Sequence, residues 1–530
     1  MKKHIDLNIT KFYSDFVFDF LNENKVLKKF YSSSFDIKNF KKQLEMKKSF
    51  SLSKRNILVK ELLSQYSGIK DKKVLKNINL LSKESTFTIT TGHQLCILTG
   101  PIFFAYKIIS VINICETLKK KYPKNHFLPV FWLASEDHDF EEISEVYFRD
   151  KKVNYLTKAK GSVGRMKIED FNVFLDQIFT FFPSNNLAKR IKKIITSAYI
   201  KKFTLTKATR WLVHQLFGDK GLIIIDPDSH NLKKMFASYM EDELINNTCH
   251  EFVNKTIKSI KKVYSKKYIP QVNPREINLF HLNVNSRKRI KRKDSKYILS
   301  EKNVSQQEML NELNERPENF SPNVLMRPLY QETILPNLCY IGGPSEISYW
   351  LQLKSFFDYH GVVFPIINPR ASVLLLTQKM RRKINKYLIN ENEIFLKKNE
   401  FVNLNIKKHS KIDINLNYLK DALDKQFEVL DGIVKITDSS FRGAVNAQKK
   451  KQFNGIDKLE KRLLKAQKRK MISIKNDLIY IYKQINPDNI FQERKINFID
   501  FYLHYGDTFF ENLFNNIDLF EKKFWVLDLK

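Results

Sequence analysis

Cysteine is rare in this chain of 530 residues, and the four that occur lie far apart. They are Cys96, Cys115, Cys249 and Cys339, and none belongs to a Cys-x-x-Cys pair. The spacing excludes the common zinc-binding and dithiol redox motifs. It is typical of a reduced, cytoplasmic protein.

Long apolar runs are also missing. Residues 1–6 lack the apolar core of a secretory signal, and no run of about 18 apolar residues could span a bilayer. We therefore expect no membrane association. Hydrophobic residues still make up 43% of the chain, which is enough for a buried core, and the length indicates an α/β domain with added helical pieces.

Acidic residues are too few to balance the basic ones. Lys and Arg number 92 against 57 Asp and Glu, a formal net charge of +35 that could attract nucleic acid. However, the lysines are scattered through a sequence rich in Asn and Ile, a pattern that AT-biased coding produces by itself. We therefore expect no nucleic-acid partner, since the basic residues of a nucleic-acid-binding protein are normally concentrated on one face.

Glycine is scarce as well, with 14 residues, against an average of about 7% in proteins. Its positions are therefore informative. Glycine allows a close backbone approach, and Ser345 could cap the helix that follows a Gly-Gly pair, leaving amide groups for an anion. An ordinary turn before a capped helix explains the pair equally well, and no Walker or dinucleotide-binding pattern is present. We assign nucleotide or phosphate binding to Gly92, Gly100, Gly342, Gly343 and Ser345.

The chain repeats one pattern in which a short apolar run is followed by a turn or a helix start. Residues 1–80 have the apolar spacing of helices, and from residue 85 the pattern becomes strand, loop, helix, strand. This order predicts an α/β fold with a doubly wound parallel sheet. The predicted strands are 87–90, 127–134, 221–225, 339–341 and 362–367.

Beyond residue 370 the composition changes to charged helices. Ile456, Leu459, Leu463 and Ala466 are spaced three or four apart, which predicts a helical hairpin or coiled coil. The predicted segments are 1–149 (N-terminal helices and the first half of the core), 150–215 (a mainly helical insertion), 216–377 (the second half of the core), 378–487 (a coiled-coil arm) and 488–530 (a segment that packs back on the core).

Two polar clusters follow predicted strands, namely Thr91-Gly92-His93-Gln94 and Ser135-Glu136-Asp137-His138-Asp139. In a parallel sheet both lie beyond the carboxyl ends of the strands, where open α/β folds bind ligands. The first cluster could stabilise negative charge, and carboxylates beside a histidine could orient a base or bind Mg²⁺. Ordinary structural roles are the alternative. We assign catalysis to His93, Gln94, Asp137, His138 and Asp139, and no residue to a metal.

Three arginines, Arg275, Arg327 and Arg370, lie beside prolines that keep the backbone extended. A fixed guanidinium suits a carboxylate or phosphate, although each arginine alone also fits a structural ion pair. Of these we assign Arg327 and Arg370 to substrate binding, together with Glu346 and Tyr349.

Several ordered motifs along nearly the whole chain resemble those of the BshC family, the cysteine ligases of bacillithiol biosynthesis. Cys96 departs from the pattern, and the helices of 378–485 match loosely. The motifs are Thr91-Gly92-His93-Gln94, Leu98-Thr99-Gly100-Pro101, Pro129-Val130-Phe131-Trp132, Ser135 to Glu142, Leu325-Met326-Arg327-Pro328-Leu329, Tyr340 to Glu346, Asn368-Pro369-Arg370-Ala371-Ser372 and Gln492-Glu493-Arg494.

This resemblance implies a Rossmann-like core, related in layout to class I synthetases, and a coiled coil associated with a homodimer. It also implies the reaction, in which the carboxyl group of L-cysteine joins the amine of glucosaminyl malate to give bacillithiol. Because a carboxylate is a poor electrophile, we expect activation by ATP, with Mg²⁺ as a candidate cofactor. We expect His93 to stabilise the phosphate, His138 to take the amine proton, and Arg327 and Arg370 to bind the malate carboxylates.

Two other functions fit the same sequence. A synthetase-like nucleotide-binding or RNA-modifying enzyme would use the same core and the basic surface, and it predicts RNA affinity with a steep salt dependence. A non-catalytic coiled-coil scaffold would use the helical arm and would tolerate loss of His93 and Asp137.

Overall fold

The computed structural model describes residues 2–148, 151–201, 204–264, 268–294, 296–300 and 302–529. The chain forms two compact units, one of residues 1–374 with Glu493–Leu529 and one of Leu375–Gln492. The arm predicted at 378–487 therefore lies wholly within the second unit. The boundary predicted between residues 149 and 150 lies outside the described residues.

A five-stranded parallel sheet forms the core of the first unit, in the order β14–β13–β2–β3–β6. Read from β6, the chain order is 3-2-1-4-5, which is the doubly wound arrangement with its switch point between β2 and β13. The predicted α/β fold is confirmed, because strands buried on both faces appear in a sequence as short apolar runs. The strands are β2 (Thr86–His93), β3 (His126–Leu133), β6 (Ile223–Ile225), β13 (Asn337–Gly342) and β14 (Ile366–Pro369).

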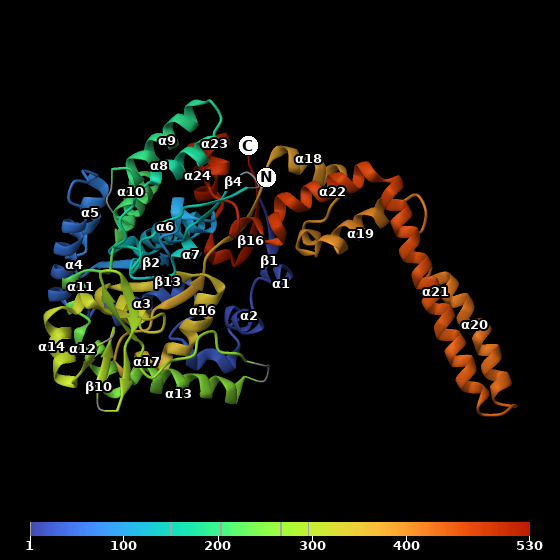
Figure 1. Ribbon diagram of the computed structural model, residues 1–530, viewed down its shortest axis with the longest axis horizontal. Coiled ribbons are helices and arrows are strands. Elements are labelled where there is room, and N and C mark those ends of the chain that lie inside the picture. Colours follow the sequence, from blue (N-terminus) through green and yellow to red (C-terminus); the bar gives the residue numbers. More distant parts are fainter. Residues whose placement is uncertain are drawn as a thin grey trace. The chain divides into compact units, whose positions relative to one another are not determined.

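Helices connect these strands and cover the sheet (Figure 1). The longest of them in this unit, α6 (Phe103–Lys121), packs on β2 and β3 and is buried along most of its length. The others are α1 (Leu7–Thr10), α2 (Asp15–Leu21), α3 (Phe40–Lys47), α4 (Leu52–Gln65), α5 (Lys72–Leu80), α7 (Phe140–Ile143), α8 (Phe171–Phe179), α9 (Asn186–Tyr199), α10 (Leu205–Phe217), α11 (His230–Lys234), α12 (Ala237–Asn246), α13 (Thr248–Val263), α14 (Gln306–Glu315), α15 (Arg327–Ile334), α16 (Pro344–Trp350), α17 (Lys354–Tyr359), α23 (Ile499–Tyr505) and α24 (Asp507–Asn516).

Small antiparallel sheets surround this core, and the sequence did not predict them. One of them, β12–β7–β8, borders the site described below. Most of these strands have only three to five residues, and β8 and β9 consist mainly of Lys and Arg, so most of them lack the apolar runs that mark the parallel sheet. They are β1 (Lys2–Asp6) with β16 (Lys523–Asp528), β4 (Glu145–Phe148) with β5 (Lys151–Asn154), β7 (Leu279–Asn283) with β8 (Ser286–Arg289) and β12 (Phe320–Pro322), and β9 (Lys291–Lys293) with β10 (Lys296–Leu299) and β11 (Lys302–Val304).

The second unit is helical, as predicted, and begins within β15 (Ser372–Leu376). Its helices α20 and α21 lie side by side as a hairpin (Figure 1). Leu423, Phe427, Leu430 and Val434 repeat at a coiled-coil spacing of four and three residues and pack with Val445. A turn at Met471 interrupts the predicted helical register. The helices are α18 (Gln378–Lys386), α19 (Lys398–His409), α20 (Asn417–Val434), α21 (Phe441–Lys470) and α22 (Ile472–Ile485).

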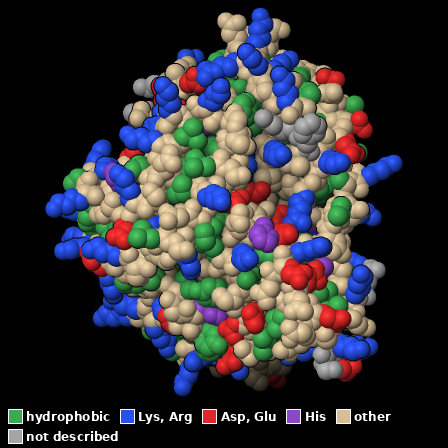
Figure 2. Space-filling view, turned by 90° about the vertical axis from the view of Figure 1, so that its left-hand side faces the viewer, with side chains coloured by type: hydrophobic (Ala, Val, Ile, Leu, Met, Phe, Trp, Pro, Cys, Tyr) green, Lys and Arg blue, Asp and Glu red, His purple; other side chains and the backbone are tan. Residues whose placement is uncertain are grey.

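The surface carries its basic charge without one dominant patch on the face shown in Figure 2. There, Lys and Arg side chains are spread widely, with Asp and Glu between them. Among the described helices, none combines the length and the apolar character that crossing a membrane requires.

Candidate active site

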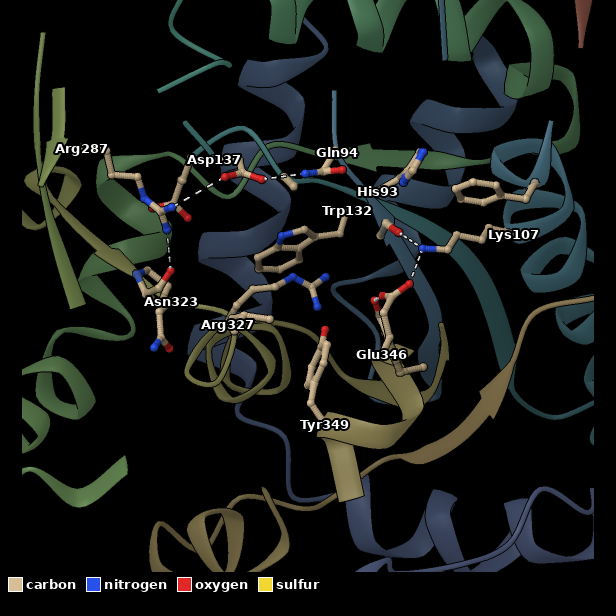
Figure 3. A pocket seen from close by; sticks show the side chains of 17 residues that line it. His93, Gln94, Lys107, Trp132, Asp137, Arg287, Asn323, Arg327, Glu346 and Tyr349 are labelled. Carbon is tan, nitrogen blue, oxygen red and sulfur yellow. Dashed lines mark hydrogen bonds and ion pairs between the residues drawn. The ribbon is translucent and has the colours of Figure 1, made fainter. Parts of the chain in front are cut away.

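A cavity of about 460 Å³ opens at the switch point of the sheet, beyond the ends of β2 and β13. Ligands bind at this place in open α/β folds. Figure 3 shows Lys107 and Glu346 on one side of the cavity and Asp137 and Arg287 on the other. The predicted residues that line it are Gly92, His93, Gln94, Asp137, Arg327, Glu346 and Tyr349.

His93 is the last residue of β2 and is packed between aromatic rings. Its ring centroid lies 5.1 Å from that of Phe103 and 5.8 Å from that of Phe104. Its Nε2 lies 3.8 Å from the Sγ of Cys96. Burial and the nearby Lys107 ammonium lower the pKa of His93 to about 3, so the imidazole stays neutral at physiological pH. A neutral imidazole can donate a hydrogen bond to an anion, but it is a weak base.

Arg327, the first residue of α15, carries an unsatisfied guanidinium. Its Cζ lies 5.0 Å from the ring centroid of Trp132 and 5.3 Å from that of Tyr340, and Nη2 donates to Gln331 Oε1 at 3.1 Å. Nη1 is buried without a hydrogen-bond partner, and within the described residues Arg327 pairs with no carboxylate. Figure 3 shows the guanidinium beneath the Trp132 indole, with the Tyr349 hydroxyl pointing toward it. A buried cation with a free donor suits an anionic ligand.

Gly92 makes this position of Arg327 sterically attainable. A Cβ atom on Gly92 would lie 2.7 Å from Arg327 Nη2, closer than carbon and nitrogen atoms can pack. The glycine predicted to bind phosphate therefore lets the guanidinium approach the end of β2.

The buried Lys107 and the half-buried Glu346 form an ion pair in the cavity wall, with Nζ and Oε1 2.6 Å apart. Lys107 Nζ also donates to the Gly92 carbonyl at 2.7 Å, and the Tyr340 hydroxyl donates to Glu346 Oε2. Burial alone would raise the pKa of Glu346, but the Lys107 ammonium and these hydrogen bonds lower it to about 2. Glu346 therefore stays ionised and holds Lys107 in place.

The prediction that Ser345 caps the following helix is wrong. The helix α16 begins at Pro344 with Gly343 as its N-cap, and Ser345 is exposed. The Gly343 amide donates to Glu346 Oε1 at 2.7 Å, so this amide is not free for an anion. Gly342 and Gly343 lie behind Glu346 and do not line the cavity.

The second predicted cluster lies in the loop between β3 and α7, opposite His93. Gln94 Nε2 donates to Asp137 Oδ2 at 3.1 Å and to Glu142 Oε2 at 2.9 Å, which joins the two clusters. His138 Nδ1 lies 3.6 Å from Asp137 Oδ1, and Nε2 lies 3.8 Å from Asp139 Oδ1. Both distances exceed hydrogen-bond length, and the hydrogen bond to Nδ1 is donated by Arg287 instead.

His138 and Asp139 line an adjoining cavity of about 330 Å³, whereas Asp137 lines both cavities. The structure therefore brings His93, Gln94 and Asp137 into one cavity and sets His138 and Asp139 at its edge. The Asp137, His138 and Asp139 ligand atoms lie within 4.8 Å of one another, a spacing that could hold a metal ion. However, Arg287 Nη1 lies 3.2 Å from His138 Nδ1 and would compete with a cation.

The inserted segment supports this loop from behind. Ser162 Oγ donates to the Ser135 carbonyl at 2.5 Å, and the Gly164 amide donates to the same oxygen at 2.8 Å. The Val163 amide donates to the Asp137 carbonyl at 2.6 Å. The Gly161–Gly164 turn, whose position relative to the site the sequence did not predict, thus fixes the backbone that carries Asp137.

Two predicted residues lie elsewhere. Arg370 is buried, and its Nη2 pairs with Glu493 Oε1 at 2.8 Å while Nη1 donates to the Ala371 carbonyl. It does not line the cavity beside Arg327, and its guanidinium has the structural ion pair that the sequence left as an alternative. Gly100 has a φ of 66° and packs on Cys96, also outside the cavity.

Two residues that line the cavity escaped the sequence-based assignment. Lys107 is a buried lysine in the apolar helix α6, and lysine is almost never buried unless it is paired, so its position was an available signal. Arg287 comes from β8, within a run of basic residues at 286–293, and nothing in that run distinguishes it.

Residues 1–371 match "Bacillithiol biosynthesis BshC, N-terminal Rossmann-like domain", and residues 373–529 match "Bacillithiol biosynthesis BshC, C-terminal coiled-coil domain". The chain is 42% identical to the "Putative cysteine ligase BshC" of Flavobacterium johnsoniae over 99% of both chains. Proteins of the same description from Flavobacterium psychrophilum (43%, over 96% of this chain and 94% of the relative) and Christiangramia forsetii (40%, over 98% and 97%) are similar to it. With its two family domains covering nearly the whole sequence, the chain belongs to the BshC family of bacillithiol biosynthesis, a family of ligases.

Proposed function

We propose that this chain joins the carboxyl group of L-cysteine to the amine of glucosaminyl malate, giving bacillithiol in the last step of its biosynthesis. The observation that carries the proposal is the unpaired Arg327 guanidinium in a cavity at the switch point of the sheet. Such a group favours an anionic substrate, and it lies beside a neutral histidine and a loop rich in carboxylates. Family membership supports the choice of substrates.

ATP would activate the cysteine carboxylate, because a carboxylate resists attack by an amine. The carboxylate oxygen attacks a phosphorus atom of ATP, and either an acyl phosphate with ADP or an acyl adenylate with pyrophosphate results. Arg327 and Lys107 supply positive charge, and the neutral His93 donates a hydrogen bond to the phosphate. Magnesium would enter with the nucleotide.

The amine then attacks the activated acyl carbon, the C–N bond forms, and phosphate or AMP leaves. His138, which lies near Asp137 and Asp139, takes the proton that the amine loses. Asp137 lies at the junction of the two cavities and is suited to hold the amine as a hydrogen-bond acceptor. We place the reaction in the cytoplasm, in keeping with four cysteines that are all free thiols.

The direct test combines the purified protein with glucosaminyl malate, L-cysteine and ATP and measures bacillithiol by mass spectrometry. We expect the product only when all three are present. If bacillithiol forms at the normal rate without nucleotide, the proposed activation by ATP is wrong. RNA affinity without product would favour the synthetase-like alternative, and the absence of both would favour a scaffold.

A further inference from the structure

The adjoining cavity of about 330 Å³ is continuous in its lining with the candidate active site. Asp137, Arg287, Asn323 and Val324 line both cavities. A substrate that fills one can therefore extend into the other.

Three arginines line this second cavity, Arg275, Arg287 and Arg289. Arg287 is fixed, since its Nε donates to Ser321 Oγ at 3.2 Å and its Nη2 to the Pro322 carbonyl at 3.1 Å. Its Cζ lies 4.0 Å from the ring centroid of Phe280. It forms part of the cavity wall.

The other two arginines are available to a ligand. Arg275 and Arg289 are exposed, and no carboxylate among the described residues pairs with either. The acids of the same cavity are Asp137, which already accepts from Gln94 and lies 3.8 Å from Arg287, and the exposed Asp139. The lining therefore holds three cations against two carboxylates, and two of the cations are free.

We propose that Arg275 and Arg289 bind the two carboxylates of the malyl group of the amine substrate in this second cavity. The inference rests on the proposed function, because it assigns one part of that substrate. Two guanidiniums match two carboxylates, each through paired N–H donors. The sugar amine then lies near Asp137 and His138, where the cavities meet. This site takes the role that the sequence gave to Arg327 and Arg370.

The test is calorimetric titration of glucosaminyl malate into the full-length Arg275→Gln/Arg289→Gln variant. Both residues are exposed, so the fold should tolerate the change. We expect binding about tenfold weaker than in the parent protein, as loss of two solvent-exposed ion pairs implies. In the assay, KM for glucosaminyl malate should rise by a similar factor, with kcat and KM for cysteine within about twofold.

A Lys288→Gln/Lys291→Gln variant is the matched control, because it removes the same charge from neighbouring strands outside both cavities. Equal weakening in both variants, or no change in the arginine variant, would overturn the subsite. Weaker ATP binding with unchanged binding of glucosaminyl malate would also overturn it, and would assign the arginines to phosphate.

A failure of the proposed function can be distinguished from a failure of this binding site. If glucosaminyl malate does not bind the parent protein, L-malate becomes the probe. Saturable L-malate binding that the arginine variant loses would retain a dicarboxylate site without the proposed reaction, whereas no L-malate binding would remove the site.

Discussion

The side chains of the cavity are arranged so that positive charge is available and the histidine is not charged. Within the part of the chain that the structure describes, Arg327 pairs with no carboxylate, whereas Lys107 pairs with Glu346. His93 sits among aromatic rings and near Lys107, which disfavours a second positive charge. Arg327 is therefore the cation of this wall with which a ligand can pair. Glu346 contributes by keeping the Lys107 ammonium in position.

The Lys107–Glu346 pair can be tested with a double-mutant cycle. Glu346→Gln leaves a buried ammonium without its counter-charge and should lower the free energy of unfolding by about 3–5 kcal/mol. Lys107→Met/Glu346→Gln should recover most of that loss, because it removes both charges. Chemical denaturation of the parent protein, the two single variants Lys107→Met and Glu346→Gln, and the double variant measures the coupling energy. Strictly additive losses of stability would show that the pair is not coupled.

The neutral state of His93 predicts a pH dependence of stability. With a pKa of about 3 in the folded state and about 6.5 when unfolded, the residue makes no contribution above pH 6.5. As pH falls below that value only the unfolded chain gains the proton, so stability decreases. As the pH falls from 7 to 5, the free energy of unfolding of His93→Gln should rise by about 1–2 kcal/mol relative to that of the parent protein. Urea unfolding at each pH measures this difference. A constant difference across this range would mean that His93 titrates normally.

At the scale of single elements, the carboxyl ends of the parallel strands determine the site. The polar clusters at the carboxyl ends of β2 and β3 could be predicted because each follows a short apolar run, and both lie at the crevice. The role of Arg287 could not be predicted, since β8 is a short antiparallel strand whose charged residues resemble those of any exposed strand. Arg370 misled the prediction because its partner, Glu493, is far away in the sequence and only the fold joins them.

Gly92→Ala tests how the end of β2 shapes the cavity. The new Cβ meets only the tip of the Arg327 side chain at short range, so the guanidinium should move and the fold should survive. We expect kcat/KM to fall by about tenfold or more, with less than about 1 kcal/mol lost in stability. Gly455→Ala, in a helix where a Cβ meets no atom within 4 Å, should leave the kinetics unchanged. Equal kinetics in both variants would contradict the role of Gly92.

Two exposed apolar side chains of the helical hairpin lie outside its core. On α20, Val429 is 66% exposed and Ile433 is 41% exposed, four residues apart on one face. If this face forms the expected homodimer, Val429→Glu/Ile433→Glu should convert a dimer into a monomer in analytical ultracentrifugation, while Glu428→Gln should not. A parent protein that sediments as a monomer, or a variant that remains dimeric, would contradict this assignment.

At the scale of the whole molecule, the parallel sheet and the helical arm could be read from the sequence, because both depend on repeated apolar spacing. The exact lining of the site could not be predicted from the sequence. It requires contacts between the inserted turn at residues 161–164, the loop at 135–139 and the antiparallel strands near 287. These segments meet through tertiary packing, and no local pattern encodes it. The proposed reaction centre therefore forms only if segments that are distant in the sequence come together.

Steady-state kinetics of cysteine addition by His93→Ala and Asp137→Asn tests this claim most directly. We expect each variant to lose about 100-fold or more in rate, as removal of a transition-state donor or of a carboxylate that holds the amine implies. His250→Ala and Asp431→Asn, at exposed positions outside both cavities, serve as controls. If both His93→Ala and Asp137→Asn retain rates within about twofold of the parent protein, the assigned active site is wrong.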